Sequence, residues 1–155
     1  WGSSSTNVVV AAGSGEVLRY DGTGWSAQNT GASDYLEGLW GSAADDVFAV
    51  GYNGAIVHYN GGSWAPHSAS TTAHLKAVWG SAANDVFAVG DNGTVLHYDG
   101  STWHQMEQVT TEVLYGVWGQ SGTDVWAVGM NGTMLHYDGV TWSPVGSGSA
   151  VIPSR

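Results

Sequence analysis

The sequence predicts an all-β protein, a β-propeller of four blades with four short antiparallel strands each. A repeat of 39 residues and the strand-and-turn pattern inside it carry this prediction. The dipeptide Trp-Gly recurs at Trp1, Trp40, Trp79 and Trp118, and a second tryptophan recurs at Trp25, Trp64, Trp103 and Trp142. A period of about 40 residues is typical of propeller blades. We therefore expect a single domain over 1–155, made of the repeats 1–39, 40–78, 79–117 and 118–155.

Each repeat contains the pattern of four strands, most clearly the third repeat. Residues 85–89 are apolar on both alternating faces, as in a strand that is buried on both sides. The turn Asp91-Asn92-Gly93 predicts a type I′ hairpin, because Asn and Gly accept a positive φ angle. No segment keeps a 3.6-residue apolar period, so we expect no helix beyond a turn. The other strands are expected at 95–98, from Trp103 onward and, opening the next unit, at 113–118.

The charge and composition of the chain exclude several classes of function. Three Lys and Arg residues face thirteen Asp and Glu, which gives a formal net charge of −10. Nucleic acids and anionic membrane surfaces are bound by clusters of basic residues, so we expect neither as a partner. No apolar run approaches the roughly 20 residues of a transmembrane helix. The absence of cysteine removes disulfides, thiolate metal sites and cysteine nucleophiles.

The third repeat, WGSAANDVFAVGDNGTVLHYDGSTW, resembles the short propeller repeats of bacterial proteins described as Asp-box-like or BNR-like. The resemblance covers all four repeats and implies the propeller fold and a secreted or surface-exposed location. The turn from Asp99 to Trp103 is similar to the Asp-box of sialidases, S-x-D-x-G-x-T-W, although Asp99 and Gly100 are adjacent. That family is mostly uncharacterised, so the resemblance implies no particular activity.

The sequence offers no catalytic residues, and we expect a protein that is not an enzyme. Sialidases, which the turn resembles, hold a carboxylate with an arginine cluster, whereas Arg19, Lys76 and Arg155 stand at unrelated repeat positions. A glycosidase needs two carboxyl groups about 5–9.5 Å apart, and the sequence pairs no two of its acids. The glycine-rich stretches join strand to strand, so we expect no phosphate-binding loop and no cofactor. Glycoside hydrolysis stays as a minor alternative.

Three sets of residues that recur in register are predicted to be structural. The tryptophans are expected to pack between blades, with platforms for sugars as the alternative. The histidines are expected to form hydrogen bonds within a blade, because one zinc ion cannot reach equivalent residues of different blades. The acids are expected to accept hydrogen bonds at turns, with calcium at Asp45 and Asp46 as the alternative to a chain without metal. The polar sets are His58, His97 and His136 with Arg19, and Asp46, Asp85, Asp124, Asp21, Asp99 and Asp138 with Asn7 and Asn60.

Comparison of the repeats with one another locates the positions that are free to bind a ligand. The position before the Asn-Gly turn and the stretch after the second tryptophan both vary. In an up-and-down blade these connections emerge on the same face, and loops on a rigid frame commonly carry binding sites. Unconstrained surface positions are the alternative reading. The candidate ligand-binding residues are Tyr35, Tyr52, His74, Asp91, His104, Glu107, Tyr115 and Trp126.

The sequence favours a non-enzymatic recognition module that binds a glycan or a protein surface through this face. A structural or self-assembling scaffold without a small ligand is the alternative. Its partner would be another copy of the chain. In line with the resemblance, we expect an extracellular or cell-surface protein whose leader is absent from this chain. The chain begins at Trp1 and not at a methionine, so either a leader has been removed or the chain is a segment cut from a longer one.

Four blades raise the question of how the ring closes. Thin blades suit larger rings, and an open half-ring would expose two apolar blade faces. Residues 151–155 could supply the missing first strand beside Trp1, with Ile152 at the place of Leu75 and Leu114. The open alternatives are a closed four-blade ring, a segment of a longer propeller, and a homodimer that forms an eight-bladed ring from two halves. We favour the homodimer.

Overall fold

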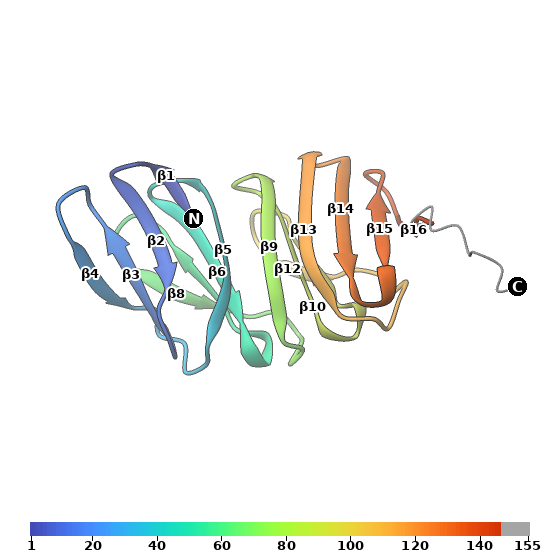
Figure 1. Ribbon diagram of the computed structural model, residues 1–155, viewed down its shortest axis with the longest axis horizontal. Coiled ribbons are helices and arrows are strands. Elements are labelled where there is room, and N and C mark those ends of the chain that lie inside the picture. The colour runs from blue at the N-terminus through green and yellow to red at the C-terminus, as the bar shows by residue number, and fades with distance from the viewer. Residues whose placement is uncertain (147–155) are drawn as a thin grey trace, which may run out of the picture.

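The computed structural model describes residues 1–146, which form four antiparallel sheets of four strands each (Figure 1). The strands of each sheet pair in chain order, so that the first and the fourth strand form its two edges. The sheets follow the 39-residue period, but the first strands of the second, third and fourth sheets begin ahead of the Trp-Gly dipeptide that opens each repeat. The predicted all-β propeller fold is confirmed. The helical elements of the described residues are three short 3₁₀ turns, Tyr52–Gly54 (η1), Asp91–Gly93 (η2) and Met130–Gly132 (η3).

The strands recur at equivalent positions in the four blades. The first strands are Gly2–Ser4 (β1), Leu36–Ala43 (β5), Leu75–Ala82 (β9) and Leu114–Ser121 (β13). The second strands are Asn7–Ala11 (β2), Asp46–Gly51 (β6), Asp85–Gly90 (β10) and Asp124–Gly129 (β14). The third strands are Glu16–Tyr20 (β3), Ile56–Tyr59 (β7), Val95–Tyr98 (β11) and Met134–Tyr137 (β15). The fourth strands are Trp25–Asn29 (β4), Trp64–His67 (β8), Trp103–Gln105 (β12) and Trp142–Pro144 (β16).

The four blades stand in an open row, with β1–β4 at one end and β13–β16 at the other (Figure 1). The first strands β5, β9 and β13 lie side by side and form the inner edge of the row. Trp25 at one end is 54% exposed and Trp118 at the other end is 58% exposed. The described residues therefore do not form a closed four-blade ring. The closing strand predicted from residues 151–155 lies outside the described residues.

The hairpin turn between the second and third strands has the predicted type I′ geometry. Asn92 and Gly93 have φ angles of 54° and 64°, and the N–H of Thr94 donates to the carbonyl oxygen of Asp91 at 3.0 Å. Asn and Gly tolerate this left-handed conformation at little cost. The turn pairs Val89 with Val95 and fixes the register of β10 and β11.

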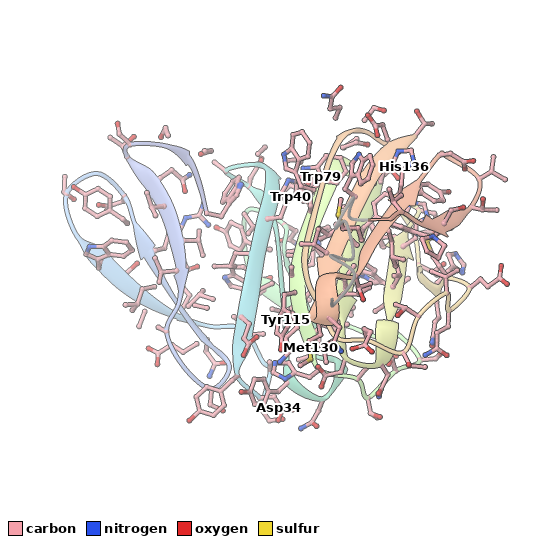
Figure 2. All side chains as sticks on the ribbon, turned by 45° about the vertical axis from the view of Figure 1, so that its right-hand side comes forward. Asp34, Trp40, Trp79, Tyr115, Met130 and His136 are labelled. Atoms are coloured by element: carbon pink, nitrogen blue, oxygen red, sulfur yellow. The ribbon has the colours of Figure 1, made fainter. Side chains whose placement is uncertain are left out.

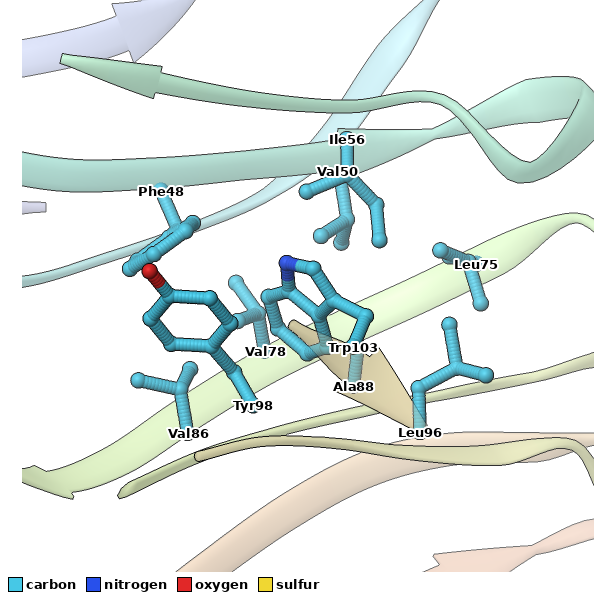
Figure 3. Close-up of a cluster of buried hydrophobic side chains, with 10 residues drawn as sticks. All are labelled: Phe48, Val50, Ile56, Leu75, Val78, Val86, Ala88, Leu96, Tyr98 and Trp103. Carbon is cyan, nitrogen blue, oxygen red and sulfur yellow. The ribbon is translucent and has the colours of Figure 1, made fainter. Parts of the chain in front are cut away.

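The apolar core lies between neighbouring sheets, as Figure 3 shows for the second and third blades. The ring of Phe48 on β6 lies 5.2 Å from that of Tyr98 and 5.5 Å from that of Trp103, between centroids. Phe87 makes the same contacts with the fourth blade. The fourth-strand tryptophan of the third blade is 7% exposed, so it is a packing residue between blades, as predicted.

The recurring Trp-Gly dipeptide also joins neighbouring blades. The ring of Trp40 covers Gly80 of the next blade so closely that a Cβ atom at Gly80 would lie 2.6 Å from it. The same contact joins Trp1 to Gly41 and Trp79 to Gly119. Each tryptophan thus needs a residue without a side chain in the following dipeptide, which explains why Trp and Gly recur together.

The recurring histidines form hydrogen bonds within their blades, as predicted. His97 Nε2 lies 2.6 Å from Asp85 Oδ1, across β10 and β11, and Ser81 donates to the other oxygen of Asp85. The equivalent histidine–aspartate pairs are His58–Asp46 and His136–Asp124, and in the first blade Arg19 donates to Asn7. These acids were expected to accept hydrogen bonds from the turn backbone. Instead they accept from side chains of neighbouring strands.

Candidate functional site

The loops of the propeller emerge on two opposite faces. One face carries the connections between first and second strands and between third and fourth strands. The other, which we call the variable-loop face, carries η1, η2, η3 and the connections between blades. Figure 2 shows Trp40 and Trp79 near the first face, and Tyr115 and Met130 near the variable-loop face. The connections that vary between repeats thus share one face, as predicted.

A pocket of about 610 Å³ opens on the variable-loop face between the second and third blades. One wall is Tyr52 of η1, and another is Asp91 and Asn92 of η2. The β8–β9 connection contributes residues 71–74, which include two threonines. Gln105 and Gln108 complete a lining in which hydroxyl and amide groups predominate. Such a lining offers hydrogen bonds to a polar ligand.

Three of the predicted ligand-binding residues form an aromatic group on this face. The ring centroids of Tyr35 and Tyr52 are 5.8 Å apart, and those of Tyr52 and His74 are 3.7 Å apart. Tyr35 is 59% exposed and Tyr52 is 41% exposed, so both present ring surface to solvent. His74 Nε2 lies 3.2 Å from Glu37 Oε1, although without the alignment of a hydrogen bond.

Lys76 connects this aromatic group to two further predicted residues. Its Nζ donates to His74 Nδ1 at 2.9 Å and lies 3.8 Å from Asp91 Oδ1. The same ammonium group lies 5.9 Å from the ring centroid of Tyr115, over its face. Because His74 Nδ1 accepts from lysine, the proton of the neutral imidazole is on Nε2. Five predicted residues are thus joined through one lysine that the sequence analysis did not select.

The other three predicted residues lie apart from this group. His104 Nε2 is 2.8 Å from Asp99 Oδ2, at the turn between β11 and β12 on the opposite face. Glu107 is exposed in the β12–β13 connection and does not line the pocket. Trp126 lies on β14 with its ring against His136, at a centroid distance of 4.4 Å. It occupies the place where the second and third blades have buried phenylalanines.

In two blades the side chain of the hairpin asparagine is paired with an acid. Asn53 Nδ2 donates to Asp34 Oδ1 at 2.9 Å, and Asn131 Nδ2 donates to Glu112 Oε2 at 2.9 Å. Each acid stands just before the first strand of its own blade and 19 residues before its asparagine. In these two blades the carboxylate therefore accepts the hydrogen bond that the asparagine side chain can donate on the variable-loop face.

The third blade has Ala73 at the position of these acids. Among the described residues, the side-chain amide of Asn92 therefore makes no hydrogen bond, and it lines the pocket together with Ala73. A free donor thus stands in the pocket where other blades hold a carboxylate. Alignment of the repeats shows this difference in the sequence, because Ala73 stands where the neighbouring repeats have Asp34 and Glu112.

The structure also bears on metals and membranes. Within residues 1–146, no three His, Asp or Glu side chains stand close enough together to ligate a metal ion. In the same part of the chain, no helix has the length and apolar character needed to cross a membrane.

The class of protein that this fold defines is the β-propeller with short repeated blades. No family model and no curated protein matches the chain. Solved structures similar to it include YCF48 bound to a D1 peptide, with a TM-score of 0.69 and 17% identity over 92% of this chain and 50% of that chain. YCF48 from Cyanidioschyzon merolae has a TM-score of 0.67 and 16% identity over 90% of this chain and 56% of that chain.

This likeness, to YCF48 among other solved structures, establishes the fold. The chain spans about half the length of these two neighbours. The similarity of the Asp99 turn to the sialidase Asp-box stays a prediction.

Proposed function

We propose that this chain is a non-enzymatic recognition module that binds a peptide segment of a partner protein in the pocket between the second and third blades. The free amide of Asn92 opposite Ala73 carries the proposal. Asn92 is exposed, so water is the acceptor for its side-chain amide in the free protein. A carboxylate or main-chain carbonyl of a peptide can replace that water at the place of the missing acid. The YCF48 structure bound to a peptide supports this class of ligand.

The remaining lining of the pocket fits an extended peptide. Gln105, Gln108 and Thr71 can pair with main-chain amides, because their side chains both donate and accept hydrogen bonds. Tyr52 offers a flat apolar surface to a peptide side chain. Among the described residues that line the pocket, Asp91 alone carries a carboxylate.

The variant Ala73→Glu tests the proposal, because it restores the acid of the other blades and gives Asn92 an internal partner. We expect peptides selected on the native protein from an array, in sets with and without Asp and Glu, to bind this variant about tenfold more weakly or worse, as measured by fluorescence polarisation. Val140→Glu adds the same charge at an exposed turn and should leave the affinity unchanged. Equal affinity of both variants would contradict the proposal.

Glycan recognition is the second candidate function, and the exposed rings of Tyr35 and Tyr52 favour it. Such rings can stack on sugars. A glycan array distinguishes the two candidates. Glycan binding that is lost in Tyr35→Ala and retained in Ala73→Glu, without peptide binding, would favour this second function.

A further inference from the structure

Each blade has two unlike apolar faces that fit one another. We call the side directed at the next blade in the chain the leading face, and the side directed at the preceding blade the trailing face. In the second blade the leading face consists of Trp40, Phe48, Val50 and Ile56. In the third blade the trailing face consists of Val86, Ala88, Leu96, Tyr98 and Trp103. Figure 3 shows side chains of the two sets meeting between the sheets.

The leading face of the fourth blade is uncovered. Trp118, at the place of Trp40, is 58% exposed, and Val128, at the place of the fully buried Val50, is 47% exposed. Trp126 takes the place of the buried phenylalanines of this face. Contiguous apolar surface of this kind on a propeller blade indicates a missing neighbour.

The trailing face of the first blade is uncovered as well. Trp25 is 54% exposed, whereas Trp103 at its place in the third blade is 7% exposed. Val10 is 41% exposed, whereas the equivalent Ala88 is fully buried. Gly2 is exposed, and no tryptophan of the described residues covers it. The two ends of the row thus present the two kinds of face that meet at the internal interfaces.

We propose that two copies of this chain complete each other as an eight-bladed ring. The leading face of the fourth blade of each copy covers the trailing face of the first blade of the other, so that a two-fold axis relates the copies. Trp118 of one copy then lies over Gly2 of the other copy, as Trp40 lies over Gly80 within the chain.

The first blade already has the aromatic pair that this interface requires. Tyr20 and Trp25 lie 5.2 Å apart with 38° between their rings. Tyr98 and Trp103, the covered pair of the third blade, lie 5.3 Å apart with 36° between theirs. The pair that receives a phenylalanine ring at an internal interface is thus formed in the uncovered blade, ready to receive Trp126 from the other copy.

A second copy is the occupant that fits both faces at once. A leading face fits a trailing face and not another leading face. When two copies associate through one such contact, one leading face and one trailing face stay uncovered. These two faces must then bind each other, which closes the ring, or bind further copies. The two similar YCF48 chains, of which this chain covers 50% and 56%, are about twice as long. Two copies of this chain together therefore have about the length of one such neighbour. The peptide pocket lies between the second and third blades, away from both faces.

Sedimentation velocity and mass photometry of the full chain at micromolar concentration test the proposal. We expect one species with twice the 16.1 kDa mass of the chain. Trp118→Glu should raise the dimer dissociation constant about 100-fold or more, because the charge would be buried on a closed interface. Val140→Glu, with the same charge at a residue that is 79% exposed, should remain dimeric. Circular dichroism shows whether each variant is folded.

Mixing two variants distinguishes this arrangement from others. Trp118→Glu damages only the leading face, and Trp25→Glu damages only the trailing face. Each should be monomeric alone, whereas an equimolar mixture should form a heterodimer, because one contact joins two undamaged faces. A folded monomeric wild type, a ladder of larger species, or a mixture that stays monomeric would each overturn the proposal.

Discussion

Three aspartates at the turns between third and fourth strands have lowered pKa values. The side-chain hydroxyl of Thr23, followed by the backbone N–H groups of Thr23 and Gly24, lowers the pKa of Asp21 to about 2. The backbone N–H of Thr102 is the largest cause of the lowered pKa of Asp99, and that of Thr141 is the largest for Asp138. A carboxylate that accepts such hydrogen bonds is favoured over the carboxylic acid.

The lowered pKa values at these turns predict how the free energy of unfolding depends on pH. Because the folded-state pKa lies below the ordinary value of 3.8, the turns stabilise the fold above that pH, and the contribution is lost as the pH falls through the folded-state values. We expect the free energy of unfolding to decline from about pH 4 to about pH 2. It should decline less in the triple variant Asp21→Asn, Asp99→Asn and Asp138→Asn, since Asn60 already serves in the second blade. Urea denaturation at each pH measures this.

Asp45→Asn provides the control, because Asp45 is exposed and accepts no turn hydrogen bond. In this variant the free energy of unfolding should decline with falling pH as steeply as in the wild type. If the triple variant showed the same slope as Asp45→Asn, the turns would not be the source of the acid sensitivity.

At the scale of elements, the fourth strands differ in how their tryptophans are paired. Trp64 Nε1 donates to Gln28 Oε1 of the preceding blade at 3.0 Å. Trp142 Nε1 donates to Met106 Sδ at 3.1 Å. An acceptor on the fourth strand of one blade, or directly after it, thus pairs with the indole N–H of the next blade. This adds a polar contact to an apolar interface.

Trp103 lacks this partner, and the variant His67→Gln should supply one. Trp103 Nε1 is buried and has no hydrogen bond among the described residues, and His67 stands at the place of Gln28. A satisfied buried donor is worth about 1 kcal/mol, so urea denaturation should show a free energy of unfolding higher by about that amount. His67→Ala removes the imidazole without supplying an acceptor and should destabilise the protein. A glutamine variant no more stable than the alanine variant would contradict the pairing.

The strand limits show which elements the sequence could predict. The third strand is expected at 95–98 and runs over Val95–Tyr98, because the turns Asp91–Thr94 and Asp99–Thr102 bound an apolar run. The first strand of the fourth blade was expected to end at Trp118 and continues to Ser121. Its small polar end pairs with β14 after a register shift, and no apolar pattern marks such a bulge.

The binding site was only partly predictable for a related reason. Tyr52, His74 and Asp91 line the pocket because the variable connections share a face, which follows from strand order alone. An asparagine recurs at the position of Asn92 in three blades, which predicts a turn residue. The unpaired amide of Asn92 depends on Ala73, 19 residues away. Alignment of the repeats shows the alanine, but that this position contacts the asparagine is seen only in the folded blades.

For the whole molecule, interfaces between blades hold the row together, and each blade buries its apolar faces only against neighbours. In repeat architectures of this kind the stability is close to a sum of the units and their interfaces. The terminal blades have one interface each, whereas the second and third blades have two. Closing the ring with a second copy would give every blade two.

The thermal midpoint of unfolding should therefore depend on protein concentration. If folded dimers unfold to separate chains, each tenfold increase in concentration stabilises the folded state by about 1.4 kcal/mol per dimer. With an unfolding entropy of about 2.1 cal/mol/K per residue over two chains, the midpoint should rise by about 2 °C for each tenfold step. Differential scanning calorimetry over two decades of concentration measures it. Trp118→Glu, confined to the monomer, should unfold at a midpoint that does not change with concentration. A wild-type midpoint equally insensitive to concentration would show that the terminal faces stay uncovered in solution.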